Sequence, residues 1–471
     1  MSGLFQKKSL DKIIAESEGG HVHLKRTLGP VNLIALGIGA IIGAGLFSLT
    51  GIAAADHAGP AVVLSFVVAA IGCAFAGMCY SEFSTMIPIA GSAYTYAYAT
   101  MGELLAWIIG WDLVIEYAIG AATVSVSWSS YVVKLLHRFG VELPNALTHC
   151  PWDDQAGLIN LPAVFVVVVI SCLLMIGISE SARVNAIIVV VKVTIVVIVI
   201  FVGYSYVKPE NYVPFIPPNI GPGEFGWSGV MRAAGVIFFA YIGFDAVSTA
   251  AQEARRPQRD MPIGIIGSLA VCTVLYIAFA RVLTGMVPYR TFHNDAAPVG
   301  TVISLFPSAA LQTAIYFGII AGYSSVILVM LLGQSRVFFS MSRDGLLPAV
   351  FSHIHPRFQT PYRSNLIVGC FVVLLGGFVP ISNLSHFTSI GTLLAFVIVC
   401  IGIVVMRRTN PGAVRPYRTP LVPLVPILGV AVCFSMMYFL DSMTWLRLGG
   451  WLAIGLCIYF GYSRHHSHLR H

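Results

Sequence analysis

Four glycines within nine residues, in the segment GIGAIIGAG, are the residues of this sequence most able to create a binding site. They are Gly37, Gly39, Gly43 and Gly45, and their neighbours are apolar. Glycine weakens a helix, so this density predicts a helix whose backbone opens and presents bare peptide groups. Such a gap offers carbonyl oxygens on one side and amide hydrogens on the other, which suits a small polar or charged ligand.

A second interruption is predicted in FFAYIGFDA, residues 238–246, where Gly243 and Asp245 lie inside an apolar run. Asp is a preferred N-cap residue, so we assign Asp245 a joint binding and capping role. The alternative is that the glycines only allow close helix packing, as Gly39 and Gly43 would do. Packing explains one such pair but not four glycines together with a second interruption and a buried Asp, and we therefore favour unwinding.

Ionisable side chains within apolar stretches are costly and mark function by default. Glu116 lies one turn beyond Asp112 on the same helix face, and we interpret it as an acid of the side-chain pocket, acting on a basic substrate directly or through water. The alternative is a carboxyl group hydrogen-bonded within the bundle. Lys192 lies about 12 Å deep at 1.5 Å per residue, farther than its stem easily reaches back to water. Burial disfavours its charge and carbonyl oxygens favour it, so this amine can switch between states.

The elements that position these residues are predicted from composition. The 471 residues are 57% hydrophobic and only 10% charged, with a mean hydropathy of +0.84, whereas an ordinary globular domain has roughly 25% charged residues. Apolar stretches of about 20 residues recur twelve times along the chain. The sequence therefore predicts an all-α polytopic membrane protein with twelve transmembrane helices, preceded by a polar segment, 1–30, and followed by a tail, 464–471.

The predicted spans divide into two similar blocks. The first five cover 31–206 and the next five cover 229–406, with two C-terminal helices in 424–463. An odd number of helices per block places the second block upside down relative to the first. Each block begins with a broken helix, at 37–45 and at 238–246, and such a pair points to the central site of a secondary transporter.

Charge predicts the orientation. Lys and Arg outside the spans favour the side of the N-terminus by about three to one, so both termini should be cytoplasmic. The net charge of +7 is then explained by topology, and no nucleic acid is expected as a partner.

Five motifs carry a family resemblance: GIGAIIGAGLF at 37–47, PIAGSAYTYAYATMGELLAWIIGWDLVIEYAIG at 88–120, QEARRPQRDMPIGI at 252–265, SRDGLLP at 342–348 and RPYRTP at 415–420. With them the chain resembles the amino acid, polyamine and organocation (APC) permeases, most closely the bacterial cationic amino acid transporters (CAT type). The resemblance implies the five-plus-five inverted repeat of the LeuT-like fold, shared with sodium-coupled leucine transporters.

An amino acid's own charges match the two ends of a broken helix. The amides of Ala44 and Gly45 should bind the substrate carboxylate, and the resemblance implies the same positions. The ammonium should bind carbonyl oxygens, those of Ile41, Phe239, Ala240 and Ile242. Relatives often have Thr where this chain has Ala44, so a hydroxyl contact to the carboxylate is missing here. Phe239, at the second break, is the expected aromatic gate.

The resemblance also gives Lys192 a role. In sodium-coupled proteins of this fold a cation lies between spans one, five and eight, and the ammonium of Lys192 is expected to replace it and to bind the opened backbone around Gly37 and Ile38. We therefore predict sodium independence and, in line with bacterial members, proton coupling. The alternative to coupling is an amine that stays charged throughout as a structural cation.

The sequence thus predicts a secondary active transporter of the bacterial inner membrane that imports cationic (arginine, lysine or ornithine) or small neutral L-amino acids by alternating access. Exchange or facilitated passage without net proton movement is the alternative mode. A non-transporting receptor or a membrane enzyme is a remote one, because the sequence has no convincing nucleophile with its base and no metal-ligand cluster. No cofactor or metal is expected. The expected partners are the substrate, protons and lipid, with a monomer that leaves room for a small accessory helix.

Overall fold

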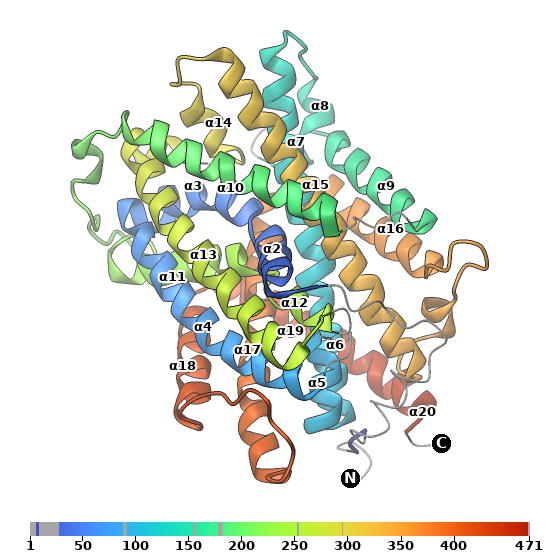
Figure 1. The fold of residues 1–471 in the computed structure, drawn as a ribbon. Helices are drawn as coiled ribbons and strands as arrows, with labels where there is room; N and C mark the ends of the chain where they lie inside the picture. Colours follow the sequence, from blue (N-terminus) through green and yellow to red (C-terminus); the bar gives the residue numbers. More distant parts are fainter. Residues whose placement is uncertain are drawn as a thin grey trace.

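Helices dominate the fold, which we describe from a computed structural model (Figure 1). The structure describes residues 6–8, 28–87, 92–153, 157–177, 182–251, 254–293 and 295–469. Most of the segment 1–30, the end of the tail 464–471 and parts of two motifs lie outside these ranges. Within them the elements are helical, and the β pairing is limited to the isolated bridges Leu28–Ala254 and Gly221–Glu224.

The helices of the first half run from α2 to α10. Their bounds are α2 Pro30–Ile41, η1 Gly45–Leu49, α3 Thr50–Ala53, η2 Ala54–Ala58, η3 Gly59–Ala61, α4 Val62–Met86, α5 Ser92–Thr100, α6 Glu103–Val114, η4 Ile115–Ile119, α7 Gly120–Arg138, α8 Asn145–Thr148, α9 Leu161–Ile176 and α10 Ala182–Tyr204. Here η marks short 3₁₀ or π segments. Two π segments, η1 and η4, lie within the predicted site, where such segments often accompany function.

The helices of the second half run from α11 to α20. Their bounds are η5 Pro209–Tyr212, α11 Gly226–Ile237, η6 Phe238–Tyr241, α12 Ala246–Thr249, α13 Pro257–Met286, η8 Tyr289–Phe292, α14 Pro298–Ile303, α15 Ala309–Arg343, η9 Ala349–Ser352, α16 Tyr362–Phe378, α17 Ile381–Thr409, α18 Leu424–Tyr438, α19 Ser442–Ile458, η10 Tyr459–Ser463 and α20 Arg464–His466.

Seven helices in the described ranges are long and apolar enough to cross a membrane. Four more are apolar but have 10–17 residues: Pro30–Ile41, Leu161–Ile176, Tyr362–Phe378 and Leu424–Tyr438. The first of these is short because the chain leaves the helix after Ile41, and α11 ends at Ile237 for the same reason. The polytopic all-helical class is therefore confirmed, whereas the number of twelve spans stays a prediction.

The broken segments lie in the interior of the bundle. Helix α13 packs against α2 and α4, and α10 packs against α2, α13 and α15. Figure 1 places α2 near the middle of the molecule, with α13, α10 and α15 around it. Both breaks are buried: Ile42 and Ala240 are each fully excluded from solvent.

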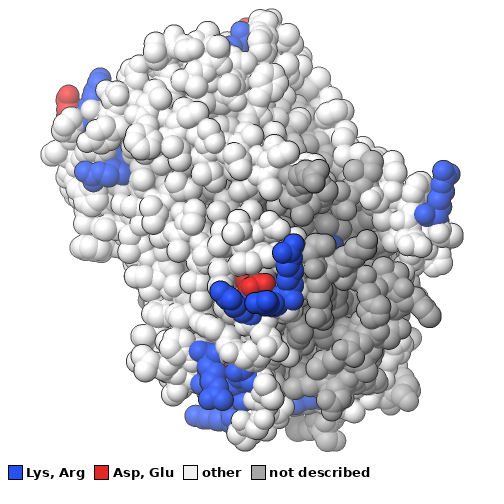
Figure 2. Space-filling view, in the orientation of Figure 1, with Lys and Arg blue, Asp and Glu red and all other residues white. Residues whose placement is uncertain are grey.

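The charged side chains form a few separate groups on the surface (Figure 2). On the face shown, Lys and Arg form separate groups at the upper left, at the top, at the right edge, near the centre and at the lower left, and the described surface between them is free of charge. Glu82, near the end of α4, is buried and accepts hydrogen bonds from Arg407 Nη2 at 2.7 Å and from the Thr419 amide at 2.8 Å. This ion pair ties α4 and α17 to the loop that carries the RPYRTP motif.

Candidate functional site

The first interruption is short. Helix α2 ends with the bond from the Ile42 amide to the Ile38 carbonyl at 2.9 Å, and Ile42 is extended, with φ −72° and ψ 103°. The amides of Leu46 and Phe47 both donate to the Gly43 carbonyl at 3.2 Å. The amides of residues 43–45 thus begin a new helix, and the first amides of a helix have no partner in its own hydrogen-bond ladder.

Gly37 and Gly39 do not lie in this interruption, and in this respect the prediction of a break across 37–45 is wrong. Both are inside α2. A Cβ on Gly37 would lie 2.4 Å from Ser268 Oγ, and one on Gly39 would lie 2.8 Å from Val189 Cγ2. These two glycines therefore serve close packing against α13 and α10, which is the alternative that the sequence left open for part of the group.

The second interruption follows α11. One 3₁₀ turn, Phe238–Tyr241, is followed by Ile242 with φ −58° and ψ 136° and by Gly243 with φ +113°. Only glycine adopts such a positive φ without strain, so Gly243 is required where it is. Asp245 then precedes α12, although its side chain makes no cap hydrogen bond. The predicted capping role of Asp245 is therefore wrong.

The two interruptions pack against each other in a reciprocal way. A Cβ on Gly45 would lie 2.1 Å from the Cα of Ala240, so the first break approaches the second backbone to backbone. A Cβ on Gly243 would lie 2.9 Å from the carbonyl carbon and oxygen of Ala40. Each break thus uses a glycine to reach the backbone of the other, and their peptide groups meet at one place in the core.

Lys192 reaches this place from α10. Its side chain is 1% exposed, and its Nζ donates to the Gly39 carbonyl at 2.7 Å. A Cβ on Gly322 of α15 would lie 2.9 Å from Lys192 Cε, so the stem passes close to that glycine. The amine therefore lies between α2, α10 and α15, and the carbonyl it binds is one residue beyond the predicted Gly37 and Ile38.

Three of the four carbonyl oxygens predicted for the ammonium, those of Ile41, Ala240 and Phe239, have protein donors. The hydroxyl of Tyr276 lies 2.9 Å from the Ile41 oxygen and 3.0 Å from the Ala240 oxygen. The Phe239 oxygen accepts from the Ile242 amide at 3.2 Å. Sequence reasoning missed Tyr276; its signal is a hydroxyl in the middle of an apolar span.

The predicted acids also meet. Glu116 lies within η4, 1% exposed, close enough to Asp245 and Asp112 for the carboxyl groups to interact. Asp245 is fully buried and accepts a hydrogen bond from the hydroxyl of Tyr117. The structure therefore brings Glu116 and Asp245 together beside the second break.

Aromatic rings flank the breaks on two sides. On one side Phe396 packs against Phe238 and Phe244, with ring centroids 5.3 Å and 4.9 Å apart. On the other side the ring of Tyr323 packs against Phe47 at 6.2 Å and Tyr131 at 5.5 Å. Phe239, the predicted gate, is 4% exposed and belongs to the turn at the second break itself.

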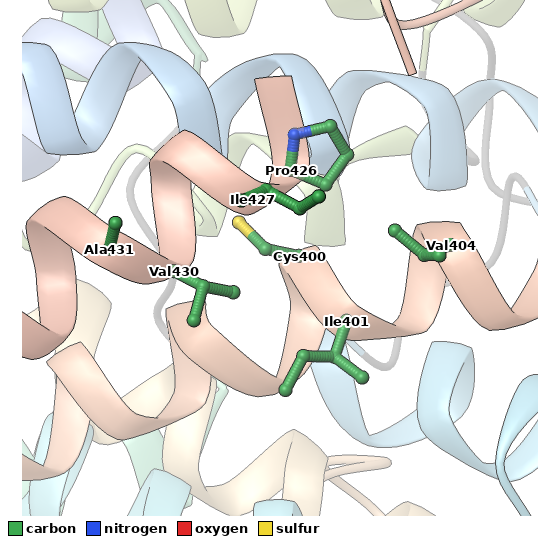
Figure 3. A pocket seen from close by; sticks show the side chains of 7 residues that line it. All are labelled: Cys400, Ile401, Val404, Pro426, Ile427, Val430 and Ala431. Carbon is green, nitrogen blue, oxygen red and sulfur yellow. The ribbon is translucent and has the colours of Figure 1, made fainter. Parts of the chain in front are cut away.

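One pocket lies away from these residues, between α17 and α18 (Figure 3). Its volume is about 360 Å³. Its lining residues are apolar or weakly polar: Cys400, Ile401, Val404, Pro426, Ile427, Val430 and Ala431. None of them is a predicted site residue, and this surface suits lipid chains rather than a charged substrate.

Comparison with known proteins identifies the family. A family model described as amino acid permease matches residues 28–445. The chain is 45% identical to a methylthioribose transporter and 45% identical to the branched-chain amino acid permease BcaP, both from Bacillus subtilis, over 99% of each chain. It is 36% identical to the vacuolar cationic amino acid transporter 4 of Arabidopsis thaliana, over 88% of this chain and 68% of that protein. With a family match over most of its length and relatives that are transporters and not enzymes, this chain belongs to the amino acid permease family of the APC superfamily.

Proposed function

We propose that this permease is a secondary transporter that carries one amino acid at a time between its two helix interruptions, by alternating access. The observation that carries the proposal is the reciprocal contact of Gly45 with Ala240 and of Gly243 with Ala40. It brings helix ends of opposite partial charge together in a buried place. The architecture proposed with it is twelve spans in the LeuT-like arrangement, with inverted repeats 31–206 and 229–406.

The substrate is recognised as a zwitterion. Its carboxylate binds the amides of Ala44 and Gly45, which begin the helix after the first break. Its ammonium binds main-chain carbonyl oxygens, those of Ile41, Phe239, Ala240 and Ile242. Charge-assisted hydrogen bonds of this kind are about twice as strong as neutral ones, so the main chain suffices to hold the cargo.

The preferred side chain is neutral and aliphatic. Both relatives at 45% identity are named for substrates without a cationic side chain, methylthioribose and branched-chain amino acids. The carboxyl of Asp245 is already held by Tyr117, and rings surround the second break. A cationic substrate is the second candidate, because Glu116 and Asp245 form a buried pair of acids that would attract an ammonium or guanidinium group.

Transport is proton-coupled and independent of sodium. The Lys192 ammonium takes the place where a metal cation would bridge α2, α10 and α15, so no sodium ion is needed. Loss or gain of a proton by this amine then changes the strength of its hydrogen bond to the Gly39 carbonyl of α2. Exchange without net proton movement is the alternative mode.

The protein works as a monomer in the bacterial plasma membrane with both termini in the cytoplasm. The excess of Lys and Arg on the side of the N-terminus, about three to one outside the predicted spans, supports this orientation, because positive residues are retained on the cytoplasmic side. The monomer leaves room for a small accessory helix beside it in the lipid.

The test is uptake into proteoliposomes that contain only this protein. Labelled isoleucine and arginine are each offered with an imposed pH gradient, with a sodium gradient, and with neither. We expect accumulation of isoleucine with an inward proton gradient alone. Arginine accumulation with no competition by isoleucine would establish the cationic candidate, and competition by methylthioribose alone would exclude zwitterion recognition. Uptake that ignores the pH gradient would exclude proton coupling.

A further inference from the structure

Tyr276 of α13 joins the two interruptions. Its hydroxyl lies 2.9 Å from the Ile41 oxygen, at the end of α2, and 3.0 Å from the Ala240 oxygen, in the turn after α11. The side chain is fully buried. Its ring packs against Phe66 and Tyr241, with centroids 5.5 Å and 5.4 Å apart, so neighbouring rings fix the hydroxyl in this position.

A phenol has one proton and donates it to one acceptor at a time. The Tyr276 hydroxyl is therefore shared between two carbonyls from two different helices. Its distances to both oxygens are those that an ammonium nitrogen makes to its acceptors, about 2.7–3.1 Å. The oxygen thus lies where the proposed function places the nitrogen of the substrate, which has three protons to give.

We propose that Tyr276 replaces the substrate ammonium whenever the site is empty, and that this allows the empty carrier to close and reorient. The inference rests on the proposed function, because it needs the carbonyls of Ile41 and Ala240 to be part of the amino acid site. When cargo arrives, its ammonium displaces the hydroxyl from these carbonyls. When cargo leaves, the hydroxyl returns and the two breaks stay joined.

The physical reason is the cost of a buried carbonyl without a donor. In a dry interior such a group is strongly disfavoured, so a closed and empty site needs an internal donor. Net uptake requires an empty return in every cycle, whereas exchange of one substrate for another passes only through loaded closed states. The hydroxyl is therefore needed for net uptake and dispensable for exchange.

The variant Tyr276→Phe removes only this hydroxyl and keeps the ring. We expect net uptake to slow about tenfold, because the empty closed state loses its donor. Exchange should stay within about twofold, and KM should fall, because the ammonium no longer competes with a hydroxyl. The matched control is Tyr212→Phe. It removes a hydroxyl that donates at 2.7 Å to the carbonyl of Arg281, which lies in α13 like Tyr276 but away from both breaks.

The experiment compares wild type and both variants in proteoliposomes, with labelled isoleucine and with labelled arginine. Net uptake is measured into empty vesicles and exchange into vesicles loaded with the same amino acid. Loss of net uptake with exchange retained, in Tyr276→Phe only, supports the inference. A parallel fall of both rates, or no change in either, overturns it. If the wild-type protein performs neither reaction, the proposed function fails and the inference falls with it.

Thermal unfolding in detergent provides a second readout that a structural role would not move. In Tyr276→Phe the empty protein lacks the donor, but bound substrate restores one. Substrate should therefore raise the Tm of this variant more than that of the wild type. An equal or smaller rise, or a variant without a cooperative transition even with substrate, overturns the inference, because the hydroxyl would then support the fold and not the cycle.

Discussion

Replacement of Gly45 by Ala tests the contact between the two breaks most directly. The added Cβ would lie 2.1 Å from Ala240 Cα and 2.6 Å from Ala240 N. Carbon atoms in good contact are about 3.5–4.0 Å apart, so the two backbones must separate by about 1.4 Å or more. Both atoms belong to main chain within a packed core, and no flexible side chain can absorb this movement.

The effect on binding follows from that displacement. The amides proposed to bind the substrate carboxylate lie on the first break, and the Ala240 carbonyl lies on the second. A substrate that keeps a hydrogen bond of about 2.9 Å to one break would therefore lie more than about 4 Å from its partner on the other break. A hydrogen bond to a charged group contributes about 1.5–3 kcal/mol, and losing one weakens affinity roughly 10- to 150-fold. Ala is a better helix former than Gly by about 1 kcal/mol, so local propensity opposes this loss and cannot cause it.

The assay is substrate affinity in detergent together with initial uptake rate in proteoliposomes. The control is Gly450→Ala, in α19, where an added Cβ meets nothing within 4 Å. We expect the control to match the wild type in both measurements and to unfold at the same or a higher temperature. Affinity of Gly45→Ala within about threefold of the wild type would refute the reasoning, because the breaks would then not hold the cargo between them.

Three further changes test other parts of the structure. Lys192→Met keeps an unbranched side chain, one atom shorter, but removes the charged donor to α2, and initial uptake should fall about tenfold or more. Glu82→Gln leaves the guanidinium of Arg407 without a countercharge and should lower the free energy of unfolding by about 3 kcal/mol, read as a fall in Tm. The hydrogen bond from His386 holds the pKa of the Asp441 carboxyl well below its usual range, so its stabilisation is present above pH about 4 and is lost as the pH falls further. Asp441→Asn should remove this part of the pH dependence from a series of Tm measurements.

Exposed residues provide the controls for these changes. Lys208→Met should transport normally, and Glu210→Gln should leave Tm unchanged, since both side chains lie at the surface. Normal uptake by Lys192→Met would contradict the assigned role of the amine. An unchanged Tm in Glu82→Gln would show that the ion pair contributes nothing to stability. A pH profile of Asp441→Asn identical to that of the wild type would place the acid sensitivity elsewhere.

The two breaks were predictable from the sequence because glycine and aspartate are costly inside an apolar helix unless the backbone opens there. The first break was misplaced by including Gly37 and Gly39. A glycine that allows close helix packing and a glycine at a helix break cannot be distinguished from the sequence alone. Only the partners distinguish them: Ser268 and Val189 fill the space beside these two glycines. Those partners lie far away in sequence, and no local pattern reports them.

Tyr276 was missed for a related reason. Its hydroxyl lies within hydrogen-bond distance of carbonyls 235 and 36 residues away in the sequence. Because every residue has a main-chain carbonyl, residue type does not identify such acceptors. Lys192 was easier to predict, because a buried ammonium is costly in any context and demands acceptors wherever it lies. The residues predicted well were thus those whose own chemistry is costly, and those missed act through the backbone of others.

The carbonyl oxygens and the amides around the first break differ in the hydrogen-bond partners that the protein supplies. Carbonyls on either side of the break receive protein donors: Lys192 on Gly39, Tyr276 on Ile41 and the Thr50 hydroxyl on Gly45 at 3.1 Å. Its amides begin a helix, and the first amides of a helix need an acceptor from outside its ladder. On the proposed function the side chains can therefore imitate the ammonium of the cargo but not its carboxylate. The carboxylate is then the group that distinguishes a loaded site from an empty one, and the part of the substrate on which closure with cargo depends.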